Sequence, residues 1–199
     1  SSEVEALYSS EFTGVRYCNA EQDSVCTVER GTVFDLSQRS WWVYSGLIFH
    51  RVYHNNMDSM RVSEGWEVYL CSSTNNSSCT FYGDGLYRDL NGGRYSMTVM
   101  PSTFEYAMKY YGIKEIGQSG TEPTGFAYLY NWAEYNYYPE SSTYTSARRM
   151  FIKQNDSTIS DLSNYIIKNN QISSVELFGD MVILFGKPSD YKRLYSSHR

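Results

Sequence analysis

Two cysteine pairs with the same spacing are the residues of this chain that specify a chemistry most clearly. Seven residues separate Cys18 from Cys26, and seven separate Cys71 from Cys79. A hairpin that folds back over such a segment brings two Cα atoms within bridging distance, so we expect the disulfides Cys18–Cys26 and Cys71–Cys79. The alternatives are a zinc site and buried free thiols. A zinc site is disfavoured because C-x7-C is not a zinc spacing and no histidine accompanies either pair.

Other side chains with catalytic potential form no recognisable constellation. The three histidines lack a metal-binding spacing, and His54, beside the Asn55–Asn56 turn, is expected to be solvated. The segment Gly117–Gly120 matches only half of the Gly-x-Ser-x-Gly motif of hydrolases. Carboxylates such as Glu134 and Glu140 show no evident pairing, which leaves a glycosidase dyad open. We therefore expect a protein without enzymatic activity.

Composition and charge indicate an exported protein. Twenty tyrosines, with abundant Ser, Asn and Gly, are typical of an all-β secreted chain. The net charge is −5 and the lysines and arginines are scattered, so no basic stripe is available to bind nucleic acid. The longest apolar stretch, Trp41–Phe49, is too short to span a bilayer, and the polar residues 1–11 are typical of a mature chain. We expect a secreted, extracellular or periplasmic protein with no transmembrane segment.

Short runs with period-two alternation dominate the chain and predict an antiparallel β-sandwich. The clearest strands are 66–70, 126–130 and 174–177. Polar turn clusters such as 72–78 separate the runs. Residues 102–116 carry apolar side chains at helical spacing after a serine, which predicts a short helix. Residues 40–53 form an aromatic insertion, and we expect them to pack as an extra strand.

The cysteine pairs belong to a repeated unit of about fifty residues. An apolar-alternating run precedes each pair, and a threonine, a glycine and an Asp-Leu dipeptide follow it. A second echo lies downstream, where Asn55–Val62, Asn91–Val99 and Asn169–Glu176 have similar sequences. The stretch Gly117–Gly125 is the best candidate for a linker. The repeat therefore predicts two domains, rather than a fold organised around one catalytic site.

These repeats resemble the βγ-crystallin superfamily, whose Greek-key motifs pair into two-sheet sandwich domains. Each motif of that family opens with a folded hairpin and closes with a sequence of the type Asn/Asp-Asn/Asp-x-x-Ser/Thr-Ser. Here Asn169–Ser174 fits all six positions, Asn55–Met60 fits five, and Gly92–Met97 keeps only the fifth. The family's hairpin signature, aromatic-x4-aromatic-x-Gly, is weaker, because Tyr137 stands where the glycine belongs.

The resemblance implies an all-β fold of tandem βγ-crystallin-like domains, each a Greek-key antiparallel β-sandwich, with a short helical linker between them. Domain 1 would span residues 12–100 and hold two motifs with Cys-stapled hairpins. Residues 101–124 would be the linker. Domain 2 would span residues 125–199, where the sequence diverges and the last unit lacks two strands.

The resemblance also implies calcium clamps, because the closing sequence is half of a two-site clamp in the calcium-binding branch of the family. One clamp would use the Asn170 side chain, the Gln171 carbonyl and Ser173 Oγ. In the first domain the equivalent ligands are the Asn56 side chain, the Met57 carbonyl and Ser59. Few charged ligands imply a weak Kd, of about 10⁻⁴–10⁻³ M. The alternative is that Asn-Asn makes a turn and the serine caps it.

An aromatic cluster at the start of the second domain is the candidate binding surface. Trp132, Tyr135, Tyr137 and Tyr138 lie close together in the sequence, and such side chains give a large contact area at low entropic cost. The consecutive tyrosines cannot share one face of a strand, so we expect at least one to be exposed. The partner would be a glycan or an extracellular protein. The alternative is that most of these aromatics fill a core.

Three functions compete on this basis. The first is a secreted, non-catalytic binding protein, such as an adhesin, a toxin-associated region or a lectin-like module, with weak calcium binding. The second is a protease inhibitor with a rigid exposed loop at residues 72–78, stapled by Cys71–Cys79. The third is a toxin or enzyme whose site lies either in the insertion, residues 41–53, or in further sequence beyond Arg199.

Overall fold

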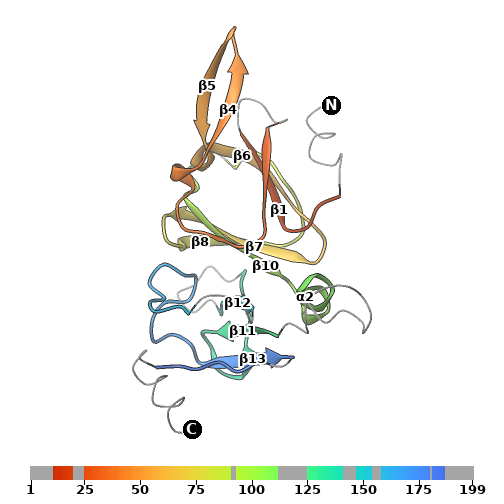
Figure 1. Ribbon diagram of the computed structural model, residues 1–199, viewed down its shortest axis with the longest axis vertical. Helices are drawn as coiled ribbons and strands as arrows, with labels where there is room; N and C mark the ends of the chain where they lie inside the picture. The colour runs from red at the N-terminus through yellow and green to blue at the C-terminus, as the bar shows by residue number, and fades with distance from the viewer. Residues whose placement is uncertain are drawn as a thin grey trace, which may run out of the picture.

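Figure 1 shows the computed structural model of the protein, which describes residues 11–19, 25–90, 93–111, 125–140, 147–153, 158–179 and 181–186. Two four-stranded sheets form a sandwich, a three-stranded sheet packs against one side of it, and a two-stranded hairpin projects from it. Every strand pair in these ranges is antiparallel. The expected all-β antiparallel fold is confirmed, whereas its Greek-key and tandem-domain details stay predictions.

The sandwich consists of two similar halves that exchange their third strands. The first sheet has the order β2-β1-β6-β9, with β1 (Val15–Asn19), β2 (Cys26–Glu29), β6 (Met57–Val62) and β9 (Gly85–Tyr87). The second has the order β3-β10-β7-β8, with β3 (Thr32–Val33), β7 (Trp66–Ser73), β8 (Ser77–Tyr82) and β10 (Ser96–Pro101). Each half opens with a hairpin, β1–β2 or β7–β8. Its short third strand then pairs in the other half's sheet, β3 with β10 and β9 with β6.

The inward-facing residues of both sheets fill the interior of the sandwich. Tyr17 and Met60 are cross-strand neighbours in the first sheet, and Leu70 and Met97 are neighbours in the second. All four side chains are fully buried and belong to one apolar cluster. Burying a side chain of this size contributes roughly 1.5–3 kcal/mol. Alternation along each strand is what brings these residues to one face.

Both predicted disulfides are confirmed. Cys18–Cys26 links β1 to β2, and Cys71–Cys79 links β7 to β8. In each hairpin the two cysteines are directly paired in the strand register. With all four cysteines bonded, the zinc and free-thiol alternatives fall away. Each disulfide stabilises its hairpin chiefly by restricting the unfolded chain.

The third layer covers the outer face of the second sandwich sheet. It contains β11 (Phe126–Tyr130), β12 (Arg149–Lys153) and β13 (Ser174–Phe178) in the order β12-β11-β13. Tyr69 and Met100 of the sandwich share a buried cluster with Tyr128 and Met150 of the third layer. The strands described in predicted domain 2 thus form one sheet, and this sheet shares a buried apolar cluster with the second sheet of the sandwich. Its assignment as a second βγ-crystallin-like domain stays a prediction.

A helix follows the last strand of the sandwich. The predicted helix at 102–116 is confirmed as α2 (Phe104–Tyr111), while residues 112–124, with the glycine-rich linker, lie outside the described residues. The helix packs on Gly65, which has φ +82°, and a Cβ there would lie 2.1 Å from the Tyr106 ring. The Tyr106 hydroxyl donates to Glu64 Oε1 at 3.0 Å. A glycine at position 65 is therefore what allows the helix to approach so closely.

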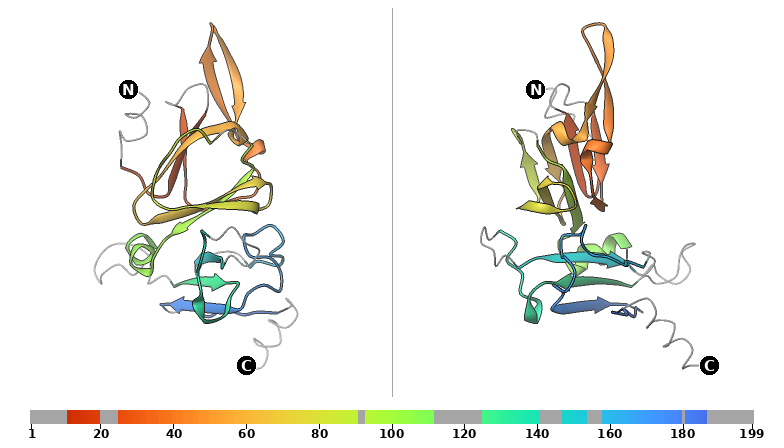
Figure 2. Two further views of the ribbon diagram at one scale, coloured as in Figure 1. Left: turned by 180° about the vertical axis from the view of Figure 1, so that it is seen from behind. Right: turned by 90° about the vertical axis from the view of Figure 1, so that its left-hand side faces the viewer.

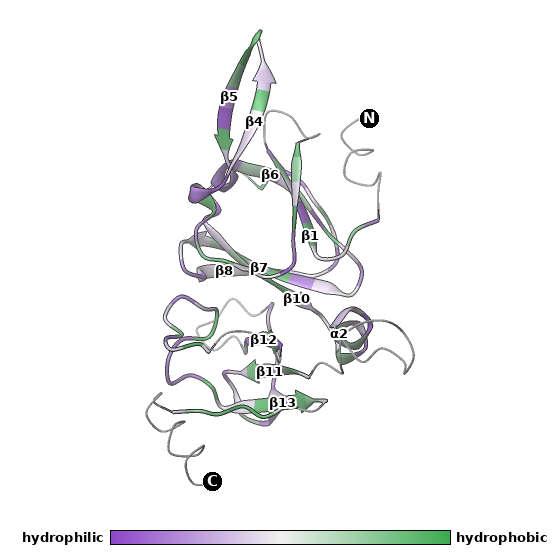
Figure 3. Ribbon diagram, in the orientation of Figure 1, coloured by the Kyte–Doolittle hydropathy of each residue, from purple (hydrophilic) through white to green (hydrophobic). Residues whose placement is uncertain are grey.

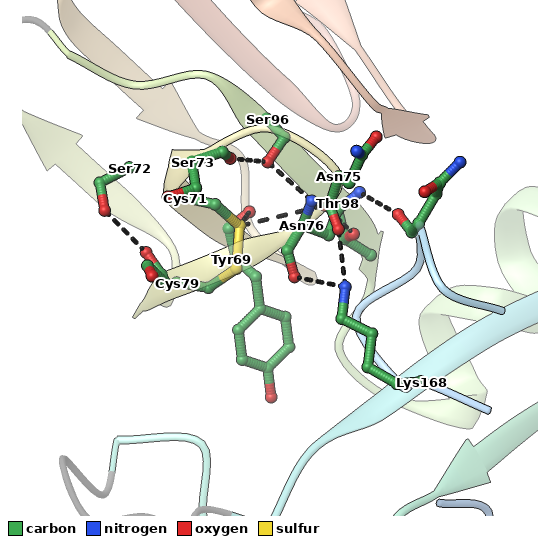
Figure 4. The surroundings of a disulfide bond; sticks show 12 residues. Tyr69, Cys71, Ser72, Ser73, Asn75, Asn76, Cys79, Ser96, Thr98 and Lys168 are labelled. Carbon is green, nitrogen blue, oxygen red and sulfur yellow. Dashed lines mark hydrogen bonds between the residues drawn. A yellow bond between two sulfur atoms is a disulfide. The ribbon is translucent and has the colours of Figure 1, made fainter. Parts of the chain in front are cut away.

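The β7–β8 hairpin is fastened to the third layer through its own tip, as Figure 4 shows. Asn76 is fully buried; its Oδ1 accepts from Thr98 Oγ1 at 2.6 Å, and its Nδ2 donates to the Asn164 carbonyl at 3.1 Å. Lys168 Nζ donates to the carbonyl oxygens of Asn75 at 2.7 Å and of Asn76 at 3.3 Å. Hydrogen bonds from the buried Asn76 amide and from the Lys168 ammonium group to backbone carbonyls therefore join layers that are distant in the sequence.

Candidate functional site

The aromatic insertion forms a hairpin that projects away from the sandwich. Its strands β4 (Ser40–Ser45) and β5 (Ile48–Tyr53) pair with each other in a sheet of their own. All views in Figures 1 and 2 agree that the hairpin extends beyond the end of the sandwich. The prediction that these residues pack as an extra strand is wrong. Because β4 and β5 hydrogen-bond to each other, neither strand extends a sandwich sheet.

The base of the hairpin is anchored in the sandwich core. Trp41, Val43 and Val52 are buried and belong to the core cluster of the sandwich. Trp41 Nε1 donates to Thr27 Oγ1 of β2 at 2.8 Å. The Trp41 and His54 ring centroids are 3.9 Å apart. The hairpin therefore leaves the sandwich from a fixed position, which limits the entropy that its outer half would lose on binding.

The outer half of the hairpin exposes large apolar side chains in all directions. The exposed fraction is 86% for Leu47, 63% for Ile48 and 68% for Phe49. Along the face opposite the core contacts, Tyr44 packs on Phe49 and Arg51 lies over the Trp42 ring, each at 4.9 Å. Figure 3 shows the apolar tip in green and a hydrophilic segment of β5 below it in purple. Exposed apolar side chains gathered in this way make the hairpin a candidate interaction site.

The turn at the tip is of an unfavourable kind for its sequence. Gly46 has φ 59° and Leu47 has φ 73°, so both central residues adopt the left-handed conformation of a type I′ turn. Glycine or asparagine is the usual second residue, and leucine there costs roughly 1–2 kcal/mol. The chain thus places a large apolar side chain at the outermost position at the expense of backbone strain, which is typical of functional segments.

His54 lies buried beside the base of the hairpin, which corrects the expectation of a solvated loop histidine. Only 5% of the residue is exposed, and its Nδ1 lies 2.8 Å from the Tyr17 hydroxyl. Its Nε2 is buried without a hydrogen-bond partner among the described residues. Burial, assisted by the nearby positive charge of Arg39, lowers the pKa of His54 to about 4. His54 is therefore neutral in the folded protein at neutral pH.

This histidine makes stability depend on pH. The pKa of His54 is about 4 in the folded protein and about 6.5 in the unfolded chain. The unfolded chain therefore binds a proton first as the pH falls below about 6.5, and the folded protein loses stability. Below about pH 4 both states are protonated, and the loss of stability from His54 is complete. Between pH 7 and pH 5 we expect the free energy of unfolding to fall by about 2 kcal/mol more in the wild type than in His54→Phe. Urea unfolding at both pH values measures the difference. Equal losses in the two proteins would contradict the assignment.

A buried ion pair connects the sandwich to the third layer. Arg149 of β12 donates to Glu67 Oε1 of β7 through Nη2 at 2.9 Å and Nε at 3.2 Å. The same carboxylate oxygen accepts from the Tyr137 hydroxyl at 2.8 Å. Burial alone would lower the pKa of Arg149, but the Glu67 carboxylate raises it above its ordinary value. Arg149 therefore stays charged and holds the two layers together.

The predicted aromatic surface is present only in part. Trp132, Tyr135 and Tyr138 are exposed, whereas Tyr137 points into the layer interface and its ring lies 4.2 Å from the Arg149 guanidinium. The Tyr135 backbone N–H donates to Ser174 Oγ at 3.1 Å, and that hydroxyl donates to the Trp132 carbonyl at 2.6 Å. Three of the four residues therefore lie on an ordered surface loop. The fourth, Tyr137, has a structural role in the layer interface instead.

The two predicted calcium clamps lie in different layers. In the first, Asn56 is exposed, Met57 begins β6, and the buried Ser59 Oγ has no hydrogen-bond partner among the described residues. In the second, Asn170 is exposed, Gln171 Oε1 accepts from the Lys168 N–H, and Ser173 Oγ donates to the Asn131 carbonyl. Each set keeps lone pairs that a hard cation could use. The described residues contain no cluster of three His, Cys, Asp or Glu side chains suited to a metal ion.

Comparison with known proteins leaves the family open. No protein-family model matches the chain, and neither the curated proteins nor the solved structures gave a match. Among the described residues, no helix combines the length and apolar character needed to cross a membrane. The site must therefore be interpreted from its own chemistry. The apolar run Leu47–Phe49 behind a glycine was the sequence signal for it, because consecutive apolar residues cannot all face one side of a strand.

Proposed function

We propose that this protein is an extracellular, non-catalytic adhesion protein that attaches to a cell surface through the tip of the β4–β5 hairpin. The observation that carries the proposal is the exposure of Leu47, Ile48 and Phe49 on an anchored base. Removing exposed apolar surface from water is a main source of the free energy of association. Two disulfides support an oxidising, extracellular setting.

Two further features support a binding role over catalysis. The Glu67, Arg149 and Tyr137 polar groups are engaged with one another in the buried layer interface, so their charge serves the fold. Likewise, the His54 ring is buried against the Trp41 ring at the base of the hairpin. The paired repeats of the sandwich, each opening with a hairpin, support a βγ-crystallin-like first domain.

The inhibitor alternative receives little support from the β7–β8 loop. Residues 72–74 and 78 are exposed, but Asn76 in the turn is fully buried, so the whole loop is not free to enter a protease. The carbonyls of Asn75 and Asn76 are bound by Lys168 of the third layer. We therefore favour the hairpin over this loop as the surface that meets a partner.

The adhesion proposal is tested with fluorescently labelled protein on a panel of eukaryotic and bacterial cells, read by flow cytometry. The key variant replaces Leu47, Ile48 and Phe49 with threonine and leaves the buried base unchanged. A matched variant, Trp132→Ala/Tyr135→Ala, removes exposed aromatics from the second surface, which is the glycan-binding alternative. We expect the tip variant to lose at least tenfold in affinity and the matched variant to bind like the wild type. Equal binding by the tip variant and the wild type would overturn the proposal.

Weak calcium binding by the two clamps is part of the proposal. The orphaned Ser59 hydroxyl favours the first clamp, and the uncharged ligand set implies a Kd of about 10⁻⁴–10⁻³ M. About 10 mM CaCl₂, but not MgCl₂, should then raise the melting temperature by about 3–11 °C per occupied clamp through binding to the folded state. Asn56→Ala/Ser59→Ala and Asn170→Ala/Ser173→Ala assign the shift to a clamp. No calcium-specific shift in the wild type would refute calcium binding and leave the turns as structural features.

A further inference from the structure

The side chains of the β4–β5 hairpin change in character from tip to base in the order found across a membrane interface. Leu47 and Ile48 are at the tip, and Phe49 lies opposite Tyr44 at the next level of the exposed face. Arg51 lies opposite Trp42, one level nearer the base, with its guanidinium over the Trp42 ring. In a bilayer, apolar chains, the aromatic belt and the charged headgroups follow one another in the same order outward from the centre.

Charge along the hairpin complements an anionic surface. The hairpin, residues 40–53, contains one arginine and one histidine but no aspartate or glutamate, although the chain as a whole has a net charge of −5. With no acidic residue on it, the segment that projects furthest is not repelled by anionic phospholipid headgroups, and Arg51 is attracted to them. An uncharged protein surface would not select against acidic residues on the hairpin.

The exposure pattern of the tip also distinguishes a bilayer from a protein surface. Ile48 and Phe49 are consecutive in β5 and point to opposite faces of the hairpin, and Leu47 extends from its end. A flat protein surface would cover one of these faces and leave the other in water. The fluid interface of a bilayer surrounds an inserted tip on all sides.

The depth of insertion follows from the backbone. The apolar part of the tip is three residues long, which at about 3.3 Å per residue matches the 5–10 Å penetration of interfacial segments. Among the described residues β4 and β5 pair in a sheet only with each other, so no neighbouring strand covers the backbone N–H and C=O groups at the edges of the hairpin, and such groups do not enter the hydrocarbon core. The hairpin is therefore built to enter the headgroup region and not to cross the bilayer.

We propose that Leu47, Ile48 and Phe49 insert into the headgroup region of anionic phospholipid bilayers, with Trp42 and Tyr44 at the boundary and Arg51 near the lipid phosphates. This inference rests on the proposed adhesive function and names its target. The bilayer itself, rather than a receptor protein, supplies the surface to which the cell-binding hairpin attaches.

The test is flotation of the full-length, disulfide-bonded protein with vesicles of phosphatidylcholine alone or with about 30% phosphatidylserine. We expect binding to the anionic vesicles, at least tenfold weaker in Phe49→Asp. Arg51→Gln should weaken binding about fivefold on the anionic vesicles only, because one basic residue near such a surface contributes about that factor. Val182→Asp is the matched control, since Val182 is 82% exposed outside the hairpin, and it should bind like the wild type. Unchanged melting temperatures establish that all variants are folded.

Depth is measured in the same vesicles with brominated lipids, which quench nearby tryptophans. Quenching that is present in the wild type and reduced in Trp42→Phe supports the proposed position of Trp42. Failure to bind either vesicle, while the threonine tip variant still loses cell binding, would overturn the bilayer inference and leave adhesion through a receptor standing. If neither vesicles nor cells distinguish the tip variant from the wild type, both proposals fall. Equal loss of binding in Val182→Asp and Phe49→Asp would also overturn the inference.

Discussion

Arg149→Met is expected to lower the free energy of unfolding by about 3–5 kcal/mol, the largest loss from any single substitution considered for this protein. The substitution removes two hydrogen bonds to Glu67 Oε1 and one, of 2.6 Å, to the Ser102 carbonyl. It also removes a cation held between the Tyr128 and Tyr137 rings, at 4.1 and 4.2 Å. What remains is a buried carboxylate without its counter-ion, and that group is the main source of the cost.

Urea unfolding of three variants separates this cost from a general loss of packing. Glu67→Gln/Arg149→Met should be more stable than Arg149→Met alone by at least about 1 kcal/mol, because no unpaired charge is left. Arg148→Met is the matched control from the adjacent position, where the guanidinium Nε has no hydrogen-bond partner among the described residues. It should cost less than about 1 kcal/mol. A loss in Arg149→Met no greater than in Arg148→Met would contradict the role of the ion pair.

Asn76→Ala should cost about 3 kcal/mol, the second largest effect, because one side chain serves two layers. The substitution leaves the buried Thr98 hydroxyl and the Asn164 carbonyl without their partners. It also places alanine in a left-handed conformation, since Asn76 has φ 55°.

Two variants at the same turn isolate these contributions. Asn76→Gly loses the same hydrogen bonds without the backbone penalty, so its loss should be smaller by about 1 kcal/mol. Asn75→Ala carries a comparable backbone penalty, since Asn75 has φ 61°. It leaves the hydrogen bonds of the Asn76 side chain in place. Urea unfolding of all three provides the comparison. If Asn76→Ala costs no more than Asn75→Ala, the buried amide does not fasten the layers.

Features with a local cause could be predicted from the sequence. Cys18–Cys26 and Cys71–Cys79 follow from the length of a hairpin. The strand at 66–70 alternates in polarity and the strand at 126–130 is a short run of apolar and aromatic residues, and both patterns are typical of strands. Helix α2 could be predicted because its apolar residues recur at helical spacing.

Features that depend on distant partners could not be predicted in this way. Strands β3 and β9 have two and three residues, too few to show any period, so the strand exchange is not visible in the sequence. Tyr137 belongs to the interface because it meets Glu67, which is 70 residues away, beside Arg149. His54 lies next to a polar turn but is buried by Trp41 and Tyr17. In each case a tertiary contact overrides the local pattern.

The prediction that residues 40–53 pack as an extra strand was wrong for a different reason. Its aromatic composition indicated a buried strand, because apolar residues usually face a core. Trp41, Val43 and Val52 do so, but the outer half has no partner element among the described residues. Composition cannot distinguish side chains that bind the protein's own core from those that bind another surface. That distinction is what makes the hairpin the candidate functional site.

The most direct measurement of hairpin-mediated attachment is the environment of the tip during binding. Ile48→Cys, labelled with an environment-sensitive fluorophore, is added to cells that bind the wild type, beside an equally labelled Val182→Cys. Both positions are more than half exposed, at 63% and 82%. If the hairpin is the attachment surface, emission shifts to the blue at position 48 and stays unchanged at position 182. A label at position 48 that remains in water while the protein is bound would contradict attachment through the hairpin.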